Sequence, residues 1–267
     1  MKEDRNFDDI AHKFAKNIYG STKGEIRQAV VWQDMESLLA EHPKQSLTVL
    51  DAGGGLGHLS RQLAQLGHNI ILCDVSQEML ALARIEVERE GLLERFQFLH
   101  CGVQDLTQKL PKPVDLVLFH AVMEWLKLPF EGLSQVLACL KPQGYASIMF
   151  YNQTGLLFKN LTCGNLTHIE QGMPHRKRFK LQPQKGLVPE EVYAHLHKND
   201  FVIKGKTGVR TFHDYMQNNY LGDYTEQQLI AMEQSLCRQE PFVSLGRYIH
   251  VWGQMGPAHS EVSKDIE

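Results

Sequence analysis

The sequence predicts an α/β fold, in which a parallel β-sheet carries helices on both faces. Between residues 47 and 151, short and almost continuously apolar segments alternate with amphipathic ones. Apolar strands separated by helices are typical of a parallel sheet that is buried on both sides. Within and after the first apolar segment, the stretch VLDAGGGLGH at 49–58 places four glycines in five positions. Backbone so free of side chains is expected where a chain turns tightly against a ligand.

The first 45 residues are expected to form a helical extension ahead of the sheet. Their apolar side chains recur at helical spacing in two groups: Ile10, Phe14 and Ile18, and then Ile26, Val30, Val31 and Met35.

Five strands and three intervening helices are expected in the core, residues 46–152. The apolar segments predict strands at 47–52, 69–75, 95–101, 114–122 and 145–151. The amphipathic segments predict helices at 57–67, 77–91 and 129–140.

A region rich in Asn, Gly, Pro and basic residues interrupts this alternation at 153–187. We expect it to be a loop-rich basic insertion after the fifth strand. The alternation resumes over 188–256, with helices at 189–199 and 225–239 and strands at 201–205 and 247–255. We expect residues 1–256 to form a single domain and 257–267 to be a flexible tail.

The composition excludes several classes of protein. With 43% hydrophobic residues, 22% charged residues and a net charge of −3, the chain is typical of globular proteins and does not favour indiscriminate nucleic-acid binding. We expect no transmembrane helix and no signal peptide, because no apolar run is long enough. The five cysteines and thirteen histidines form no metal-ligand pattern. We therefore expect no metal, and reduced core thiols in a cytoplasmic protein.

The spacing of the glycines distinguishes between two nucleotide cofactors. The dinucleotide pattern G-x-G-x-x-G requires a third glycine where this chain has His58. The pattern acidic-x-G-x-G-x-G is met by Asp51 and the three alternate glycines that follow it. The next strand ends in an acidic residue, Asp74, where a carboxylate can accept hydrogen bonds from ribose hydroxyls.

With these features the sequence resembles the class I S-adenosylmethionine-dependent methyltransferases, which have a Rossmann-like sheet. The resemblance implies that Gly53 and Gly54 lie against the methionine part of the cofactor and that Asp74 binds the ribose. It implies that Val103 offers its backbone N–H to the adenine, and that His120 lines the pocket near the transferred methyl group.

One contact to the adenine is left open by the resemblance. Where the family often has an acid that accepts from the adenine amino group, this chain has Gly102. Either Gln104 or Asp105 could take that role.

Each assignment has a structural alternative. The glycines could form only a tight turn, and His120 could be a hydrogen-bonded core residue. Asp74 could stabilise the helix that begins near Ser76 through the helix dipole.

Longer segments narrow the resemblance to one family. They are NFDDIAHKFAKNIYGSTKGEIRQAVVWQD, FHAVMEW, MFYNQTG, KTGVRTFHDY and CRQEPFVSLGRYIHV. These look like the tRNA 5-carboxymethoxyuridine methyltransferases, which esterify a modified wobble uridine of bacterial tRNA. The match implies that Arg27 contacts the cofactor, most plausibly its carboxylate, and that the partner is the anticodon region of tRNA.

The implied reaction needs no catalytic acid or base. A carboxylate with a reference pKa of about 4 is ionised near neutral pH. It can attack the sulfonium methyl group directly once the two groups are aligned and desolvated. We therefore expect no general base among the residues of the site.

Binding of tRNA requires cations and aromatic rings. The insertion supplies four cations within HRKRFK: Arg176, Lys177, Arg178 and Lys180. Further candidates follow the later strands: Tyr151, Arg210 and Arg247. A basic run of this kind is usually only a solvated surface.

Two other functions remain open at this point. The chain could be a class I methyltransferase for a small acid or amine, with the basic insertion as plain surface. It could also be a non-catalytic RNA-binding module that retains S-adenosylmethionine. No obligate protein partner is evident.

Overall fold

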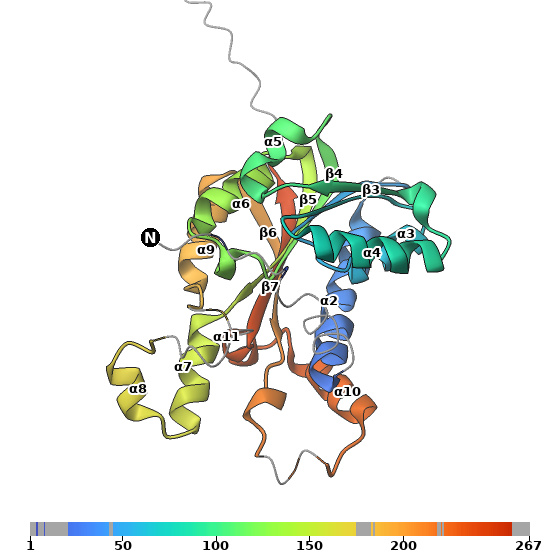
Figure 1. Cartoon of the computed structure of the whole chain (residues 1–267). Helices are drawn as coiled ribbons and strands as arrows, with labels where there is room; N and C mark the ends of the chain where they lie inside the picture. Colours follow the sequence, from blue (N-terminus) through green and yellow to red (C-terminus); the bar gives the residue numbers. More distant parts are fainter. Residues whose placement is uncertain are drawn as a thin grey trace, which may run out of the picture.

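A seven-stranded sheet forms the centre of the molecule, in the strand order β3-β2-β1-β4-β5-β7-β6 (Figure 1). The computed structural model describes residues 4, 8, 21–42, 45–174, 183, 185–217, 220 and 222–257. The strands are β1 (Thr48–Ala52), β2 (Asn69–Asp74), β3 (Phe96–His100), β4 (Val114–His120), β5 (Leu140–Tyr151), β6 (Phe201–Val209) and β7 (Tyr248–Met255).

The direction of one strand differs from the expected all-parallel sheet. The pairs from β3 to β5 are parallel, whereas β7 pairs antiparallel with both β5 and β6. The apolar pattern of a buried strand does not encode its direction, so the sequence could not reveal this.

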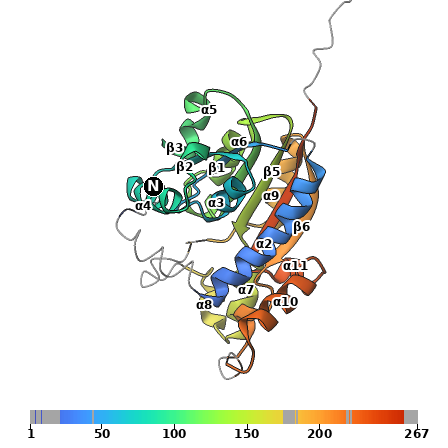
Figure 2. The ribbon, with the colours of Figure 1, turned by 90° about the vertical axis from the view of Figure 1, so that its right-hand side faces the viewer.

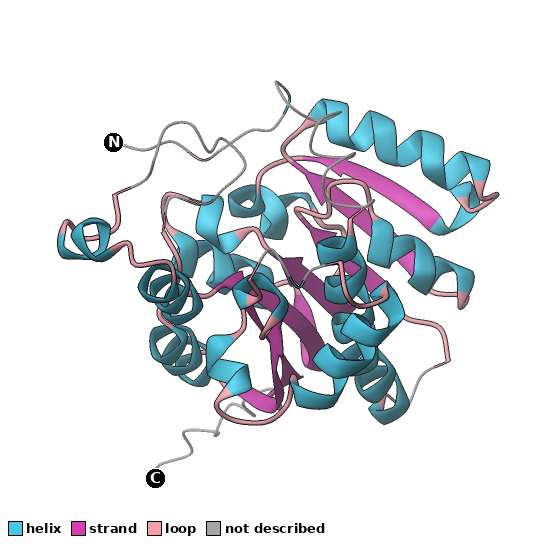
Figure 3. Cartoon of the chain, turned by 90° about the horizontal axis from the view of Figure 1, so that it is seen from below, coloured by secondary structure: helices cyan, strands magenta, loops and turns pink. Residues whose placement is uncertain are grey.

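Helices cover both faces of the sheet (Figure 3). The longer ones are α2 (Thr22–Glu41), α3 (His58–Gln65), α4 (Gln77–Arg89), α6 (Pro129–Leu137), α7 (Gln153–Thr162), α9 (Pro189–Lys198) and α10 (Glu226–Leu236). The shorter ones are α5 (Leu106–Lys109), α8 (Leu166–Glu170) and α11 (Phe242–Leu245). One apolar core lies between the sheet and helices α6 and α9, and a second lies between the sheet and α2, α3, α4 and α10.

The helical extension is part of the second core. Ser21 caps α2 by accepting from the backbone N–H of Gly24, and the helix buries one apolar side that includes Ile26, Val30 and Met35. Figure 2 shows α2 running beside β6 toward α10, which it contacts. Residues 9–20, with the first expected apolar group, lie outside the described residues.

The region after β5 contains more helix than expected. Its described part begins with α7 and α8 rather than loops. Asn152 caps α7 through its side chain. The residues around it are polar, so the composition of this segment predicted loops although it forms a helix.

Two strands also extend beyond their predicted ends. Strand β5 begins at Leu140 instead of 145, and β6 continues to Val209 instead of 205. In β5 the register shifts between the Leu140 and Tyr145 pairs, which accommodates polar residues that do not look like a strand.

The cysteines are free thiols, and one differs from expectation. Cys73, Cys101, Cys139 and Cys237 are buried, whereas Cys163 is exposed.

Candidate active site

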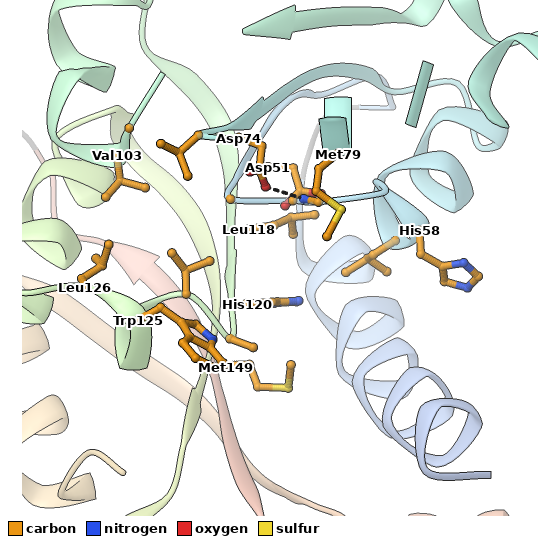
Figure 4. A pocket seen from close by; sticks show the side chains of 18 of the residues that line it. Asp51, His58, Asp74, Met79, Val103, Leu118, His120, Trp125, Leu126 and Met149 are labelled. Atoms are coloured by element: carbon orange, nitrogen blue, oxygen red, sulfur yellow. Dashed lines mark hydrogen bonds between the residues drawn. The ribbon is translucent and has the colours of Figure 1, made fainter. Parts of the chain in front are cut away.

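A cavity lies where the strand order reverses between β1 and β4, beyond the carboxyl ends of these strands (Figure 4). Ligands of doubly wound sheets bind at this reversal. The empty volume of the cavity, including the solvent at its open mouth, is about 1390 Å³. Its lining includes every residue expected to contact the cofactor: Arg27, Gly53, Gly54, Asp74, Val103, Gln104 and His120.

The glycine-rich loop lines the cavity, and two of its glycines have no room for a side chain. The backbone N–H groups of Gly53 and Gly54 donate to the carbonyl of Cys73, at 2.8 and 3.1 Å. Gly53 has φ +75°, and a Cβ on it would lie 2.6 Å from Val122. A Cβ on Gly54 would lie 2.4 Å from both Asp51 and Leu72. Gly53 is therefore required for conformation and space and Gly54 for space, whereas Gly55, with φ +56° and open space around it, is required for conformation alone.

Asp74 serves two purposes in the structure. Its Oδ2 accepts from the N–H of Gly55 at 2.9 Å, and its Oδ1 accepts from the N–H of Ser76 at 2.8 Å. Ser76 is the N-cap of α4, so Asp74 also supports the start of this helix, which was the structural alternative for this residue. Asp74 also faces the cavity, and burial raises its pKa despite these backbone donors.

The neighbouring Asp51 is a second buried acid. Its Oδ2 accepts from the hydroxyl of Ser60 at 2.6 Å. Burial, together with the charge of Asp74, raises the pKa of Asp51 to about 7, although the hydrogen bond from Ser60 opposes the rise. Paired acids of this kind favour a cationic ligand nearby.

At the adenine end expected from sequence, the wall is formed by a short turn over Val103–Asp105. Gln104 lines the cavity, and its side-chain nitrogen donates to Asp4, which also lines it. Asp105 is not among the lining residues. Asp4 comes from the start of the chain, a position that no sequence pattern connects with this loop.

His120 ends β4 at the other side of the cavity. Its Nε2 lies 2.8 Å from Ser147 Oγ, whose hydroxyl is 2.7 Å from His250 Nε2. Burial, with the positive charge of Arg27, holds the pKa of His120 well below its usual value. The next residue, Ala121, has φ +58°, a left-handed conformation that costs free energy for a non-glycine residue.

A second cluster lies at the same edge of the sheet, where β5, β6 and β7 meet. Tyr151 pairs with Tyr248, which pairs with Val209, so the adjacent Arg247 and Arg210 come together there. The guanidinium of Arg247 lies 4.9 Å from the Tyr151 ring centre, and that of Arg210 lies 5.6 Å from the Tyr248 ring centre. Like Ala121, Arg210 has a positive φ, +60°.

One buried acid holds the cations of this cluster. Asp214 Oδ2 lies 2.6 Å from Arg210 Nη2 and 3.8 Å from Arg247 Nε, and Lys23 is 3.6 Å from its Oδ1. Although burial opposes it, the His213 ring 3.8 Å from Oδ1 and these cations hold the pKa of Asp214 far below its usual range. One carboxylate therefore faces three cations, and the cluster has an excess of positive charge.

Unpaired donors remain in the cluster. Arg210 Nε and Arg247 Nη1 are buried and make no hydrogen bond within the described chain. Buried donors without partners are unusual and point to a ligand with acceptor oxygens.

The loop that carries Arg210 is fixed by Glu233 of α10. This fully buried carboxylate accepts from the backbone N–H groups of Thr211, Phe212 and His213, at 2.6, 3.2 and 3.0 Å. The same loop holds Tyr215, whose hydroxyl donates to the carbonyls of Leu245 and Gly155.

Glu124 is an acid that sequence reasoning missed. Both of its carboxyl oxygens are buried without a well-formed hydrogen bond to described residues. Burial raises its pKa to about 7, and the backbone amides of Glu124 and Tyr151 and the charge of Arg27 offset this only in part. Glu124 lies in the segment FHAVMEW and Asp214 in KTGVRTFHDY, but the sequence assigned neither a role, because their partners come from distant segments.

The remaining expectations concern the basic segment, a metal ion and membrane-spanning helices. Arg176, Lys177, Arg178 and Lys180 lie outside the described residues. Within the described ranges, no group of His, Cys, Asp and Glu residues could hold a metal ion. None of the helices there has the length and apolar character needed to cross a membrane.

Comparisons with known proteins agree with this geometry. Residues 49–144 match the family model described as a methyltransferase domain. The tRNA 5-carboxymethoxyuridine methyltransferase of Escherichia coli (strain K12) is 47% identical over 249 residues, which cover 93% of this chain and 95% of that protein.

More distant relatives share the fold. A ubiquinone biosynthesis O-methyltransferase of Caulobacter vibrioides is 28% identical over 173 residues, which cover 64% of this chain and 65% of that protein. The solved structure of magnesium protoporphyrin IX methyltransferase from Synechocystis PCC 6803 with bound SAH superposes with a TM-score of 0.64 at 16% identity, covering 94% of this chain and 96% of that one. The latter likeness concerns the fold alone.

Proposed function

Because this chain belongs to the tRNA 5-carboxymethoxyuridine methyltransferase family, we propose that it transfers a methyl group from S-adenosylmethionine to 5-carboxymethoxyuridine in tRNA. The observation that carries this conclusion is 47% identity along 93% of the chain to the Escherichia coli enzyme. Similarity confined to residues 46–152 would be shared with many methyltransferases and would not identify the substrate. Here the similarity also includes the segments that form the second cluster.

We propose that the cavity at the β1–β4 reversal binds the cofactor. Its residues fit this group: Gly53 and Gly54 leave the wall free of side chains, and the buried acids Asp51 and Asp74 suit a ligand with ribose hydroxyls and positive charge. Gly53 and Gly54 would lie against the methionine part, Asp74 would accept from the ribose, and Arg27 would pair with the carboxylate. Val103 would donate to the adenine, with Gln104 beside it in the wall.

We propose that Arg210 and Arg247 bind the carboxylate of the substrate. Their unpaired N–H groups are donors, and guanidinium groups match the geometry of a carboxylate. Tyr151, which is only 2% exposed, would act by holding Arg247 rather than by stacking on a base.

The reaction then follows from alignment. When bound, S-adenosylmethionine supplies a methyl group made electrophilic by its sulfonium charge. The two arginines would hold the substrate carboxylate with one oxygen directed at that methyl group, and transfer of the methyl group from sulfur to this oxygen would give a neutral ester and S-adenosylhomocysteine. No proton is transferred, so the chain's residues need only orient the oxygen and exclude water.

The position of the uridine and the place of the reaction are further proposals. The family resemblance favours the wobble position in the anticodon region, and a cytoplasmic enzyme would meet its tRNA there. The basic segment at 176–180 would contact phosphates around it.

The test uses bulk tRNA from a strain that lacks this protein, incubated with purified enzyme and methyl-labelled cofactor. We expect label in tRNA that is released by mild alkali, as a methyl ester is. Matched tRNA from a strain unable to make the carboxymethoxy group is the control and should take up none. Alkali-stable label, or label only on small acids, would contradict the proposal.

A further inference from the structure

A chain of buried hydrogen bonds runs from α2 through the sheet to His120. Arg238 donates to Asp34 Oδ1 from Nε and Nη2, at 3.0 and 2.7 Å. Asp34 Oδ2 lies 2.7 Å from His250 Nδ1, and the chain continues through Ser147 to His120 Nε2. Asp34, Ser147 and His250 are at most 1% exposed. His120 Nδ1, at the far end, has no hydrogen bond with the described residues, and the side chain lines the cavity.

The charges of Arg238 and Asp34, at the buried end of this chain of hydrogen bonds, determine which atom is the donor in each bond. Burial opposes it, but the hydrogen bonds from His250 and Arg238 keep the pKa of Asp34 below its usual value. Since Arg238 already balances the charge of Asp34, a second cation on the fully buried His250 would be uncompensated. A neutral His250 donates Nδ1–H to Asp34, so its Nε2 accepts from Ser147, and Ser147 Oγ accepts Nε2–H from His120.

We propose that Asp34, His250 and Ser147 are positioning residues that fix His120 as the neutral tautomer with its lone pair on Nδ1 facing the cavity. This inference rests on the proposed function. A lone pair favours the positively charged methyl group and adds no third donor to the carboxylate oxygen that attacks, beyond the donors of Arg210 and Arg247. An N–H at the same place would hydrogen-bond that carboxylate and weaken it as a nucleophile, and an imidazolium would repel the sulfonium.

A single isosteric substitution should reverse the chain. In Asp34→Asn, Arg238 continues to require an acceptor at the Oδ1 position, so the amide nitrogen must face His250. The amide then donates to Nδ1, His250 donates Nε2–H to Ser147, and Ser147 donates to His120 Nε2. The proton of His120 moves to Nδ1, and an N–H faces the cavity.

The reversal is measured on the full-length protein labelled with ¹⁵N-histidine. Two-bond ¹⁵N–¹H correlation spectra distinguish the two tautomers, and a His120→Gln variant assigns the signal. We expect Nε2–H in the wild type and Nδ1–H in Asp34→Asn. Turnover on tRNA should fall roughly 10- to 100-fold, as when outer partners of a functional histidine are lost, with the KM for cofactor nearly unchanged.

Two further variants control for loss of structure. Asp115→Asn removes another buried carboxylate that is paired with a cation, Lys141, at the opposite end of β4, and should retain turnover. Ser147→Ala interrupts the chain without reversing it, and should lower turnover less than Asp34→Asn does.

The inference is overturned by a protonated Nδ1 on His120 in the wild type, or by full turnover in Asp34→Asn. It is also overturned if Asp115→Asn loses as much turnover as Asp34→Asn. A wild type that methylates no tRNA would instead refute the proposed function, while the spectra still decide the tautomer.

Discussion

At the scale of single residues, the site is defined by acids that the fold keeps from water. Burial raises the pKa of Asp51, Asp74 and Glu124, so the folded protein holds these carboxylates at a cost in free energy when they are ionised. A cationic sulfonium compound reduces that cost when it binds nearby. The product has lost this charge, so the same residues should favour the reactant form of the cofactor over the product.

Replacing Asp74 tests the cofactor site directly. Asp74→Ala should weaken S-adenosylmethionine binding by about 1–3 kcal/mol, because charged hydrogen bonds to the ribose are lost. Titration calorimetry measures this. Asp105→Ala, an acid just outside the cavity lining, is the matched control and should bind normally. If Asp74→Ala binds S-adenosylmethionine with unchanged affinity, the role of Asp74 is limited to the start of α4.

The buried Glu124 makes stability depend on pH. Its pKa is raised from 4.5 to about 7 in the folded protein, so the folded state binds this proton more tightly than the unfolded state does. The stabilisation is fully present below about pH 4.5 and is lost as the pH rises through 7. Glu124→Gln should therefore be more stable than the wild type at pH 8, by about 1–3 kcal/mol, and should differ little at pH 4.5.

Urea unfolding of both proteins at several pH values measures the effect. The midpoint difference between Glu124→Gln and the wild type should grow between pH 4.5 and 7.5. A difference that is constant with pH would show that Glu124 does not titrate in this range.

The arginine cluster is tested by substitutions that keep its charge. Arg210→Lys and Arg247→Lys cannot present the planar pair of donors, and each should raise the KM for tRNA roughly tenfold or more with cofactor affinity unchanged. Arg238→Lys changes an arginine that pairs with Asp34 and not with Asp214, and it should leave the KM for tRNA near the wild-type value. Equal effects of all three variants on the KM would argue against a carboxylate site at Arg210 and Arg247.

At the scale of elements, the sequence predicted the strands well where apolar runs were continuous. The strands β1 to β4 and β7 lie within their predicted ranges. Each of them has an uninterrupted buried segment except the edge strand β3, which is only partly buried. Predictions were poorer where polar residues enter the sheet, as in β5 and β6, or where a helix is short and polar, as in α8. The expected cofactor residues, which the structure places in the lining of one cavity, were predictable as a group because they lie in or beside local motifs. Asp34, Glu124 and Asp214 were not, because only folding brings them to their partners.

The basic segment of the insertion is an element whose role remains a prediction. Replacing Arg176, Lys177, Arg178 and Lys180 with alanine should raise the KM for tRNA and leave cofactor affinity alone. Each lost phosphate contact should make the slope of log affinity against log salt shallower by about 0.7–0.9.

The control replaces three exposed lysines elsewhere, Lys109, Lys112 and Lys198, with alanine. That variant should bind tRNA normally. If the segment variant modifies tRNA normally at both low and physiological salt, the segment is ordinary surface.

At the scale of the whole molecule, distant parts of the chain complete one structure. Helix α2 packs on β6 and α10, and Asp34 on that helix contacts His250 on β7. The cofactor cavity takes Arg27 from the same helix. The extension is therefore part of the catalytic unit rather than an appendage.

This arrangement predicts one cooperative unfolding transition. Circular dichroism at the helix band and fluorescence of the three tryptophans should give coincident thermal curves, with calorimetric and van't Hoff enthalpies that agree. Met35→Ala, which removes a fully buried side chain of α2, should lower the free energy of unfolding of the whole unit by about 2–5 kcal/mol. A separate early transition for α2 would show that the extension folds on its own.

The place of β7 in the sheet has a consequence for the synthesis of this protein. Strand β7, the last of the described strands along the sequence, lies between β5 and β6, and among the described strands it is the only one that pairs with β6. Until residues 247–255 have been synthesised, β6 has no strand of this sheet to join, and Arg247 and His250 are absent. Nascent chains and fragments that end before residue 247 therefore lack the edge of the sheet where the substrate is proposed to bind. Translation has to pass this strand before the proposed substrate site can form.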